Sequence, residues 1–136
     1  MKKRFGILLV LALCALLPMQ TFVGVSPVAA MQVAEDPTRN LSKKERKKIP
    51  FEVWVKSPTA KFLKKKESSN NCKARGYKGM YLGTWQMNAG FWKTYGGKKY
   101  GSNPTKATCR EQDLVAYRGW LARGWSPWPP AKNFKP

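Results

Sequence analysis

The chain has 136 residues, enough for one domain, and carries 26 basic against 7 acidic side chains, a formal net charge of +19. Histidine is absent, which excludes His-based catalytic triads and histidine-containing metal sites. A charge this positive predicts attraction to polyanions such as wall teichoic acids, anionic lipid headgroups, lipopolysaccharide or nucleic acid, and does not choose among them.

The N-terminal 30 residues have the three-part layout of a secretory signal peptide. Basic residues occupy positions 2–4, an apolar run covers 5–17, and small residues at 28–30 mark a cleavage site. The apolar run is shorter than the roughly 20 residues that span a bilayer, although a retained membrane anchor is the alternative. Cleavage after Ala30 leaves a charge of +16, because three basic residues are removed from the +19. We therefore expect a secreted protein, either extracellular or associated with the cell wall.

Residues 31–56 are expected to form a basic flexible arm ahead of a catalytic domain at 57–136. The run at 43–48 is almost entirely basic, and residues 32–48 offer almost nothing apolar to bury. Such an arm would bind anionic wall polymers or a membrane surface, or would serve only solubility.

Helix signals follow the expected arm. Ser57 and Pro58 predict the N-cap and the first position of a helix that runs to about Glu67. A short strand or extended turn is expected over 80–85, and one or two helical turns over 86–92.

The last third of the chain contains the clearest helix. Thr108 with Glu111 three residues later predicts a capping box at its start, and Gly124 predicts its end. An aromatic, proline-containing tail follows at 125–130 and cannot continue the helix.

Two cysteines survive the expected cleavage, Cys72 and Cys109. An even pair in a small exported chain predicts one disulfide, with two free thiols as the alternative. The bridge would close a loop of 37 residues, which is worth about 4 kcal/mol in a chain-entropy estimate.

Glu67 is the candidate catalytic carboxylate. The other six carboxylates lie in the expected arm, or in the first turn of the last helix. The three lysines at 64–66 would lower the pKa of Glu67, whereas burial beside aromatic rings would raise it, and the sequence leaves both open. An ordinary solvated glutamate at a helix end is the alternative.

A catalytic Glu67 would act alone. No Asp or Glu lies between Ser68 and Arg110, although a two-carboxylate glycosidase needs its second acid about 5–9 Å from the first. Glu67 would protonate the glycosidic oxygen, while the N-acetyl group or the 6-hydroxyl of the substrate replaces the second carboxylate. Such chemistry suits N-acetylated glycans such as peptidoglycan.

Aromatic side chains crowd the region from residue 77 to residue 128, and aromatic faces can stack on sugars. The alternative is that most of these rings form the core, because so small a domain has few aliphatic side chains. The candidate substrate contacts, aromatic and amide, are Tyr81, Trp85, Gln86, Asn88, Trp92 and Trp125.

Several short motifs follow one another in this part of the chain. They are Glu-Ser-Ser-Asn-Asn at 67–71, Tyr-Leu-Gly-Thr-Trp-Gln-Met at 81–87, Trp92, Gly-Gly-Lys-Lys-Tyr at 96–100, Arg-Glu-Gln at 110–112 and Gly-Trp-Ser-Pro-Trp-Pro at 124–129. In order and spacing, residues 60–130 resemble the resuscitation-promoting-factor and transglycosylase-like domain family. The resemblance implies a small, mostly helical, lysozyme-like α+β fold. It also implies action on the β-1,4 bonds of peptidoglycan, with Glu67 as acid/base and Gln86 in contact with the sugar.

The sequence departs from the family pattern near Glu67. Lys66 and Pro130 stand where the family often has cysteines, so a bridge between Cys72 and Cys109 would be a relocated disulfide. Ser69-Asn70 replaces the Gly-Gly pair of the family motif. These changes affect the expected shape of the cleft more than its chemistry.

We therefore expect a secreted, peptidoglycan-cleaving glycosidase, either a lytic transglycosylase or a muramidase, that acts as a monomer without metal or cofactor. The alternative is a non-catalytic, cationic module that binds walls or other polyanions on the same fold. Binding of nucleic acid through basic and aromatic groups is a third interpretation, and export argues against it.

Overall fold

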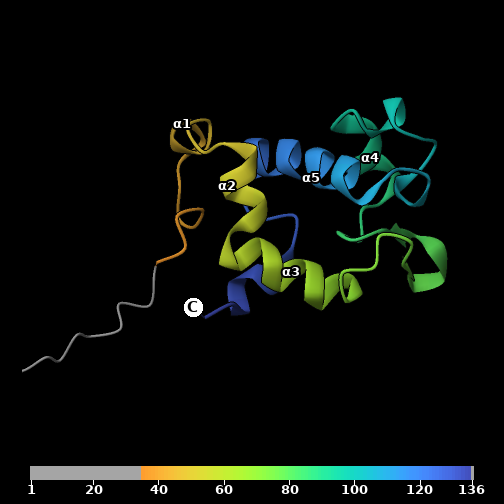
Figure 1. The fold of residues 1–136 in the computed structure, drawn as a ribbon, viewed down its shortest axis with the longest axis horizontal. Helices are drawn as coiled ribbons and strands as arrows, with labels where there is room; N and C mark the ends of the chain where they lie inside the picture. Colours follow the sequence, from red (N-terminus) through yellow and green to blue (C-terminus); the bar gives the residue numbers. More distant parts are fainter. Residues whose placement is uncertain (1–34, 136) are drawn as a thin grey trace, which may run out of the picture. The chain divides into compact units, whose positions relative to one another are not determined.

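The computed structural model describes residues 35–135, so the expected signal peptide at 1–30 lies outside the described residues. This part of the chain is mostly helical (Figure 1), with one small two-stranded sheet and one disulfide, which confirms the predicted α+β class. The elements are α1 (Lys43–Arg46), α2 (Phe51–Lys56), α3 (Pro58–Ser68), β1 (Arg75–Gly76), β2 (Tyr81–Leu82), α4 (Ala89–Thr94) and α5 (Cys109–Arg123), with 3-10 turns η1 (Tyr77–Gly79), η2 (Gly97–Lys99), η3 (Pro104–Lys106) and η4 (Pro129–Asn133).

The two longest helices, α3 and α5, begin where their capping signals predict. The Ser57 hydroxyl accepts a hydrogen bond from the Ala60 amide at 3.2 Å, with Pro58 at the first helical position. Thr108 and Glu111 form the full reciprocal capping box at the start of α5. These predictions are confirmed because a cap is a local contact between residues a few positions apart.

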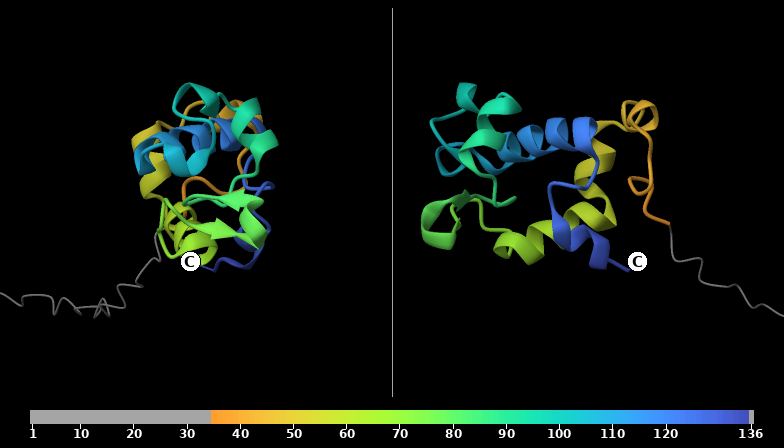
Figure 2. Two further views of the ribbon diagram at one scale, coloured as in Figure 1. Left: turned by 90° about the vertical axis from the view of Figure 1, so that its right-hand side faces the viewer. Right: turned by 180° about the vertical axis from the view of Figure 1, so that it is seen from behind.

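The sheet is a short hairpin. Strands β1 and β2 run antiparallel, with Arg75 opposite Leu82 and Gly76 opposite Tyr81 (Figure 2), and Leu82 also bridges to Met87. The strand expected over 80–85 is thus present but shorter. The helix expected over 86–92 begins later, at α4, because Asn88 is its N-cap and accepts from the Phe91 amide at 2.8 Å.

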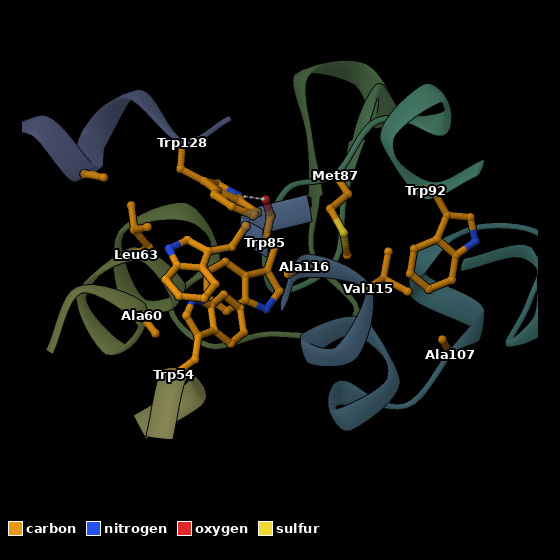
Figure 3. Close-up of a cluster of buried hydrophobic side chains, with 12 residues drawn as sticks. Trp54, Ala60, Leu63, Trp85, Met87, Trp92, Ala107, Val115, Ala116 and Trp128 are labelled. Carbon is orange, nitrogen blue, oxygen red and sulfur yellow. Dashed lines mark hydrogen bonds between the residues drawn. The ribbon is translucent and has the colours of Figure 1, made fainter. Parts of the chain in front are cut away.

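Tryptophan rings build the core. Trp54 is fully buried and stacks on Trp85 and Trp125, with ring centroids 5.1 and 5.6 Å apart. Trp128 lies beside Trp85, and its indole nitrogen donates to the Trp85 carbonyl at 3.0 Å (Figure 3). Stacked and tilted indoles therefore fill the space that aliphatic side chains fill in larger domains.

The segment expected to be a flexible arm is instead folded from residue 35 onwards, and this expectation is corrected. It contains α1 and α2, and α2 contributes Trp54 to the core and contacts both α3 and α5. Farther back, the buried Asp36 accepts a hydrogen bond from the Thr59 amide at 2.6 Å, in the first turn of α3. The lysines of this segment stay in solvent, while Trp54, Asp36 and Arg46 bind it to the rest of the domain. The high charge of the segment therefore did not predict whether it folds.

Cys72 and Cys109 form the predicted disulfide, with their Cα atoms 5.3 Å apart. The bridge joins the loop after α3 to the first residue of α5. Within residues 35–135, no helix combines the length and the apolar character needed to cross a membrane.

Candidate active site

The end of α3 opens into a cleft of about 490 Å³. Glu67 is the next-to-last residue of α3 and lies in its wall. The hairpin, the turn after it and the chain that follows α5 provide the other walls. The lining residues are Glu67, Tyr77, Tyr81, Trp85, Gln86, Asn88, Pro127, Trp128, Pro129 and Pro130.

A left-handed turn stops α3 immediately after Glu67. Ser69 and Asn70 have φ angles of 53° and 64°, and their amides return to the carbonyls of Lys65 and Lys64 at 2.9 and 3.0 Å. Glycine adopts this backbone without steric cost, whereas serine and asparagine do so at some expense. The two residues thus keep the backbone that suits the Gly-Gly pair they replace.

The end of α3 is tied to the opposite side of the cleft. The Ser68 hydroxyl lies 2.9 Å from the Thr84 carbonyl, one residue before Trp85 and two before Gln86. This contact joins the residue after Glu67 to the turn that carries the candidate sugar-binding amide. The same hydroxyl also lies 3.2 Å from the Lys64 carbonyl of its own helix, so Ser68 links the end of α3 to the turn.

Burial raises the pKa of Glu67 above its ordinary value. The neighbouring lysines do not offset this effect. Lys64 is half-buried and forms an ion pair with Asp113, 3.3 Å away, and Lys65 and Lys66 are exposed. The sequence left open whether the lysines or burial would dominate the pKa of Glu67. Burial dominates, so Glu67 holds its proton to a higher pH than a solvated glutamate.

A tight turn after the hairpin presents Gln86. Its φ is 45°, the bridge between Leu82 and Met87 closes the turn, and its side-chain amide donates to the Gly83 carbonyl at 3.0 Å. Gly76 of β1 lies against this side chain, and a Cβ at position 76 would collide with the Gln86 amide oxygen. The hairpin therefore fixes both the backbone and the side chain of Gln86.

Helix α5 supports this turn from behind through Gln112, which is fully buried. Its side-chain oxygen accepts from the Thr84 amide at 2.8 Å, and its nitrogen donates to the carbonyls of Cys72 and Pro104 at 2.8 and 2.7 Å. The adjacent Asp113 accepts from the Trp85 indole at 2.7 Å. Two consecutive polar residues of α5 therefore hold the floor of the cleft.

The comparison with known families agrees with this arrangement. Residues 56–131, more than half of the chain, match the transglycosylase-like domain model. The chain belongs to the transglycosylase-like domain family. No curated protein and no solved structure matches it. The matched region contains every residue that lines the cleft, whereas most of the segment before α3 precedes it.

Four of the candidate residues come together on the accessible walls of this transglycosylase-like cleft. Glu67 and Gln86 are half-buried, and Tyr81 and Asn88 are exposed. Trp85 also borders the cleft, but its side chain is fully buried and its indole is engaged by Asp113. Trp85 is therefore part of the floor rather than a ring available for stacking.

Trp92 and Trp125 do not line this cleft, and their role as substrate contacts stays a prediction. Trp92 is 1% exposed, packs against Gly97 and donates to the Gly101 carbonyl at 2.9 Å, apart from Trp85 (Figure 3). The Trp125 indole donates to the Thr38 carbonyl at 3.0 Å, and its ring lines a different pocket. The residue type alone did not separate core rings from surface rings.

Tyr77 also lines the cleft; it belongs to the aromatic-rich region noted in the sequence but was not among the candidate substrate contacts. It is 74% exposed at the tip of the hairpin, and its φ of 41° turns the chain there. Trp128 and the prolines around it form the facing wall. Trp128 and two of these prolines belong to the Gly-Trp-Ser-Pro-Trp-Pro motif at 124–129, which supported the resemblance. They were not among the candidate substrate contacts.

Among the described residues that line the cleft, Glu67 alone carries a carboxylate. Nowhere within residues 35–135 do three or more His, Cys, Asp or Glu side chains gather as they would around a metal ion. The chemistry on offer in the cleft is proton transfer by one half-buried acid, beside aromatic and amide groups that suit a glycan.

Proposed function

We propose that this chain is a secreted glycosidase that cleaves the β-1,4 bonds of peptidoglycan, with Glu67 as its single acid/base. One observation carries the proposal: among the described residues, the sole acid that lines the cleft of this transglycosylase-like domain is a carboxyl whose pKa is raised by burial. An ordinary helix-end glutamate would be solvated and ionised. Glu67 is instead suited to hold a proton until the leaving oxygen takes it.

In the first step, protonated Glu67 gives its proton to the glycosidic oxygen as the bond from that oxygen to C1 breaks. The sugar develops oxocarbenium character, and its own N-acetyl oxygen or 6-hydroxyl supplies the electron pair that a second carboxylate would supply elsewhere. The ionised Glu67 then accepts the proton of the 6-hydroxyl or of a water molecule. Attack by the 6-hydroxyl leaves an anhydro product, whereas attack by water leaves a reducing end.

The other cleft residues have roles in binding under this proposal. The exposed rings of Tyr77 and Tyr81 lie where a sugar would stack, and the amides of Gln86 and Asn88 can bond to hydroxyl and acetamido groups. Trp128 and its prolines limit the width of the cleft on the facing side.

The test is release of soluble muropeptides from purified peptidoglycan by wild-type protein and by Glu67→Gln. Loss of a general acid lowers the rate by about 10²–10⁴-fold, so the variant should release almost nothing. Glu52→Gln is the matched control, because Glu52 is an exposed carboxylate of α2 whose ion pair with Arg110 is also exposed. Fragment masses then distinguish anhydro from reducing ends. Equal activity of Glu67→Gln and wild type would refute the proposal.

A second candidate function is a cationic wall-binding module without catalysis. The observation in its favour is the charge: the described residues form only two ion pairs, so most of the basic side chains have no acidic partner there. Such a module would bind anionic wall polymers, release no fragments, and lose affinity steeply with salt. Wall binding that survives in Glu67→Gln, with no fragments from wild type, would favour it.

A further inference from the structure

A second pocket, of about 310 Å³, lies across the Trp128–Pro129 segment from the candidate active site, and both cavities include these two residues in their walls. One side of it is built by residues 38–41 and 46, and the other by the chain after α5, residues 124–132. The first side precedes the region that matches the family model. The pocket is therefore formed where the folded N-terminal segment of this chain meets the transglycosylase-like domain.

Within residues 35–135, three basic side chains and no carboxylate line this second pocket. Arg46 is held in place, because each of its three guanidinium nitrogens donates to a carbonyl, of Leu121, Leu41 and Ala122, so it supplies fixed positive charge at the end of α5. Arg39 gives one N–H to the Phe134 carbonyl at 2.7 Å and keeps its other donors. An anion entering the pocket would thus meet oriented positive charge without a competing carboxylate in the wall.

The remaining wall is largely apolar, with the ring of Trp125 and the side chains of Leu41 and Ala131. The acids nearest to these residues along the chain are already engaged: Glu45, next to Arg46, accepts from the Ser42 amide, and Asp36 accepts from Thr38 and Thr59. An apolar wall with basic groups at its edge fits a short peptide that ends in a carboxylate better than it fits a highly hydrated phosphate chain.

We propose that the second pocket binds the carboxylate-bearing stem peptide of peptidoglycan, an inference that rests on the proposed function of the neighbouring cleft. The muramic sugars of peptidoglycan carry such peptides on their lactyl groups. A glycan strand in the cleft can direct a stem across Trp128 and Pro129, which border both cavities. Arg39 and Lys132 then receive its carboxylate, and Trp125 and Leu41 contact its apolar side chains.

The experiment measures binding of a synthetic stem tetrapeptide to the wild-type protein by titration calorimetry at fixed salt. Arg39→Gln combined with Lys132→Gln should weaken the affinity about tenfold, the loss expected for a charge-assisted contact. The matched control removes two charges elsewhere, at the exposed Lys93 and Lys98, and should change it less than twofold. Lys132→Gln alone serves as a second variant, because Lys132 is exposed, whereas Arg39 also bonds to the Phe134 carbonyl.

Three results would overturn the inference: no binding of the tetrapeptide, equal weakening by the control pair, or binding of a glycerol-phosphate polymer that the tetrapeptide does not displace. Because the free peptide contains no glycosidic bond, this readout is independent of cleavage. Digestion of stem-free glycan without tetrapeptide binding would sink this inference and leave the proposed function standing. Tetrapeptide binding without any glycan cleavage would refute the proposed function and leave the peptide-binding pocket standing.

Discussion

At the scale of a single residue, Glu67 combines a position at the end of α3 with a raised pKa. Helix α3 ends within two residues of it, and burial raises its pKa. A raised pKa keeps the acid form populated to higher pH, which is the form that donates a proton to a leaving group. The same burial removes solvation from the ionised form, so function here opposes stability.

The pH dependence of cleavage follows from the direction of that shift. Activity should fall as pH rises through the raised pKa of Glu67, because the general acid is then ionised before it meets substrate. A profile of kcat/KM against pH measures this pKa in the free protein. A falling limb in the range of an ordinary solvated glutamate, near pH 4.3, would contradict the assignment.

Ser69 offers a second test at the residue scale. Its φ of 53° is a backbone that glycine adopts freely, so Ser69→Gly should raise the free energy of unfolding by about 1 kcal/mol. Ser102→Gly is the control, because Ser102 is exposed and is not among the positive-φ residues, so glycine there should lower stability slightly. Urea unfolding of both variants measures the difference. A stability loss in Ser69→Gly would show that the hydroxyl matters more than the backbone strain.

At the scale of elements, α5 is the helix that holds the cleft in shape. Gln112 joins the turn before Gln86 to the loops at Cys72 and Pro104, and a Cβ at position 83 would collide with its side-chain amide. Gly83 therefore packs directly against the Gln112 side chain. The geometry of the candidate sugar-binding residue therefore depends on a buried amide one helix away.

Replacing Gln112 with leucine should cost about 2 kcal/mol or more, because the Thr84 amide and two carbonyls lose their partner inside the protein. The folded fraction should also bind glycan more weakly, since the Gln86 turn is no longer held. Thermal unfolding measures the first effect, and glycan binding below the melting temperature measures the second. Wild-type stability of Gln112→Leu would refute this role of Gln112.

The elements differ in how far the sequence could predict them. Ser57 and Thr108 marked helix starts correctly because a cap is read within four residues. Gln112 was noted only as part of the Arg-Glu-Gln motif, and its supporting role was not predicted because its partners lie 8, 28 and 40 positions away. Trp92 was assigned to the cleft for the same reason, since burial is decided by residues distant in the sequence.

At the scale of the molecule, the folded N-terminal segment is the main difference between expectation and structure. Its lysines predicted an arm in solvent, yet Trp54 lies in the core and the Thr38 carbonyl accepts from the Trp125 indole at 3.0 Å. A composition argument averages over a segment, whereas docking depends on single residues. This segment also completes the second pocket, so its attachment bears on binding as well as on stability.

The ionised carboxylate of Asp36 should make the docking of the N-terminal segment depend on pH. Burial alone would raise the pKa of Asp36, but hydrogen bonds from Thr38 and Thr59 outweigh it and lower the pKa. A lowered pKa means that the ionised carboxylate stabilises the fold above the unfolded value of about 3.9, and that this stability is lost as pH falls through the folded value.

Asp36→Asn should therefore lower the free energy of unfolding by about 1–3 kcal/mol at neutral pH, because one of its donors must face an amide nitrogen. The gap from wild type should close in acid, once the wild-type carboxyl is also protonated. Glu35→Gln, an exposed neighbour, should stay within about 0.5 kcal/mol of wild type. Urea unfolding at several pH values measures both variants. A gap that persists unchanged in strong acid would mean that Asp36 holds the segment by shape, and not by charge.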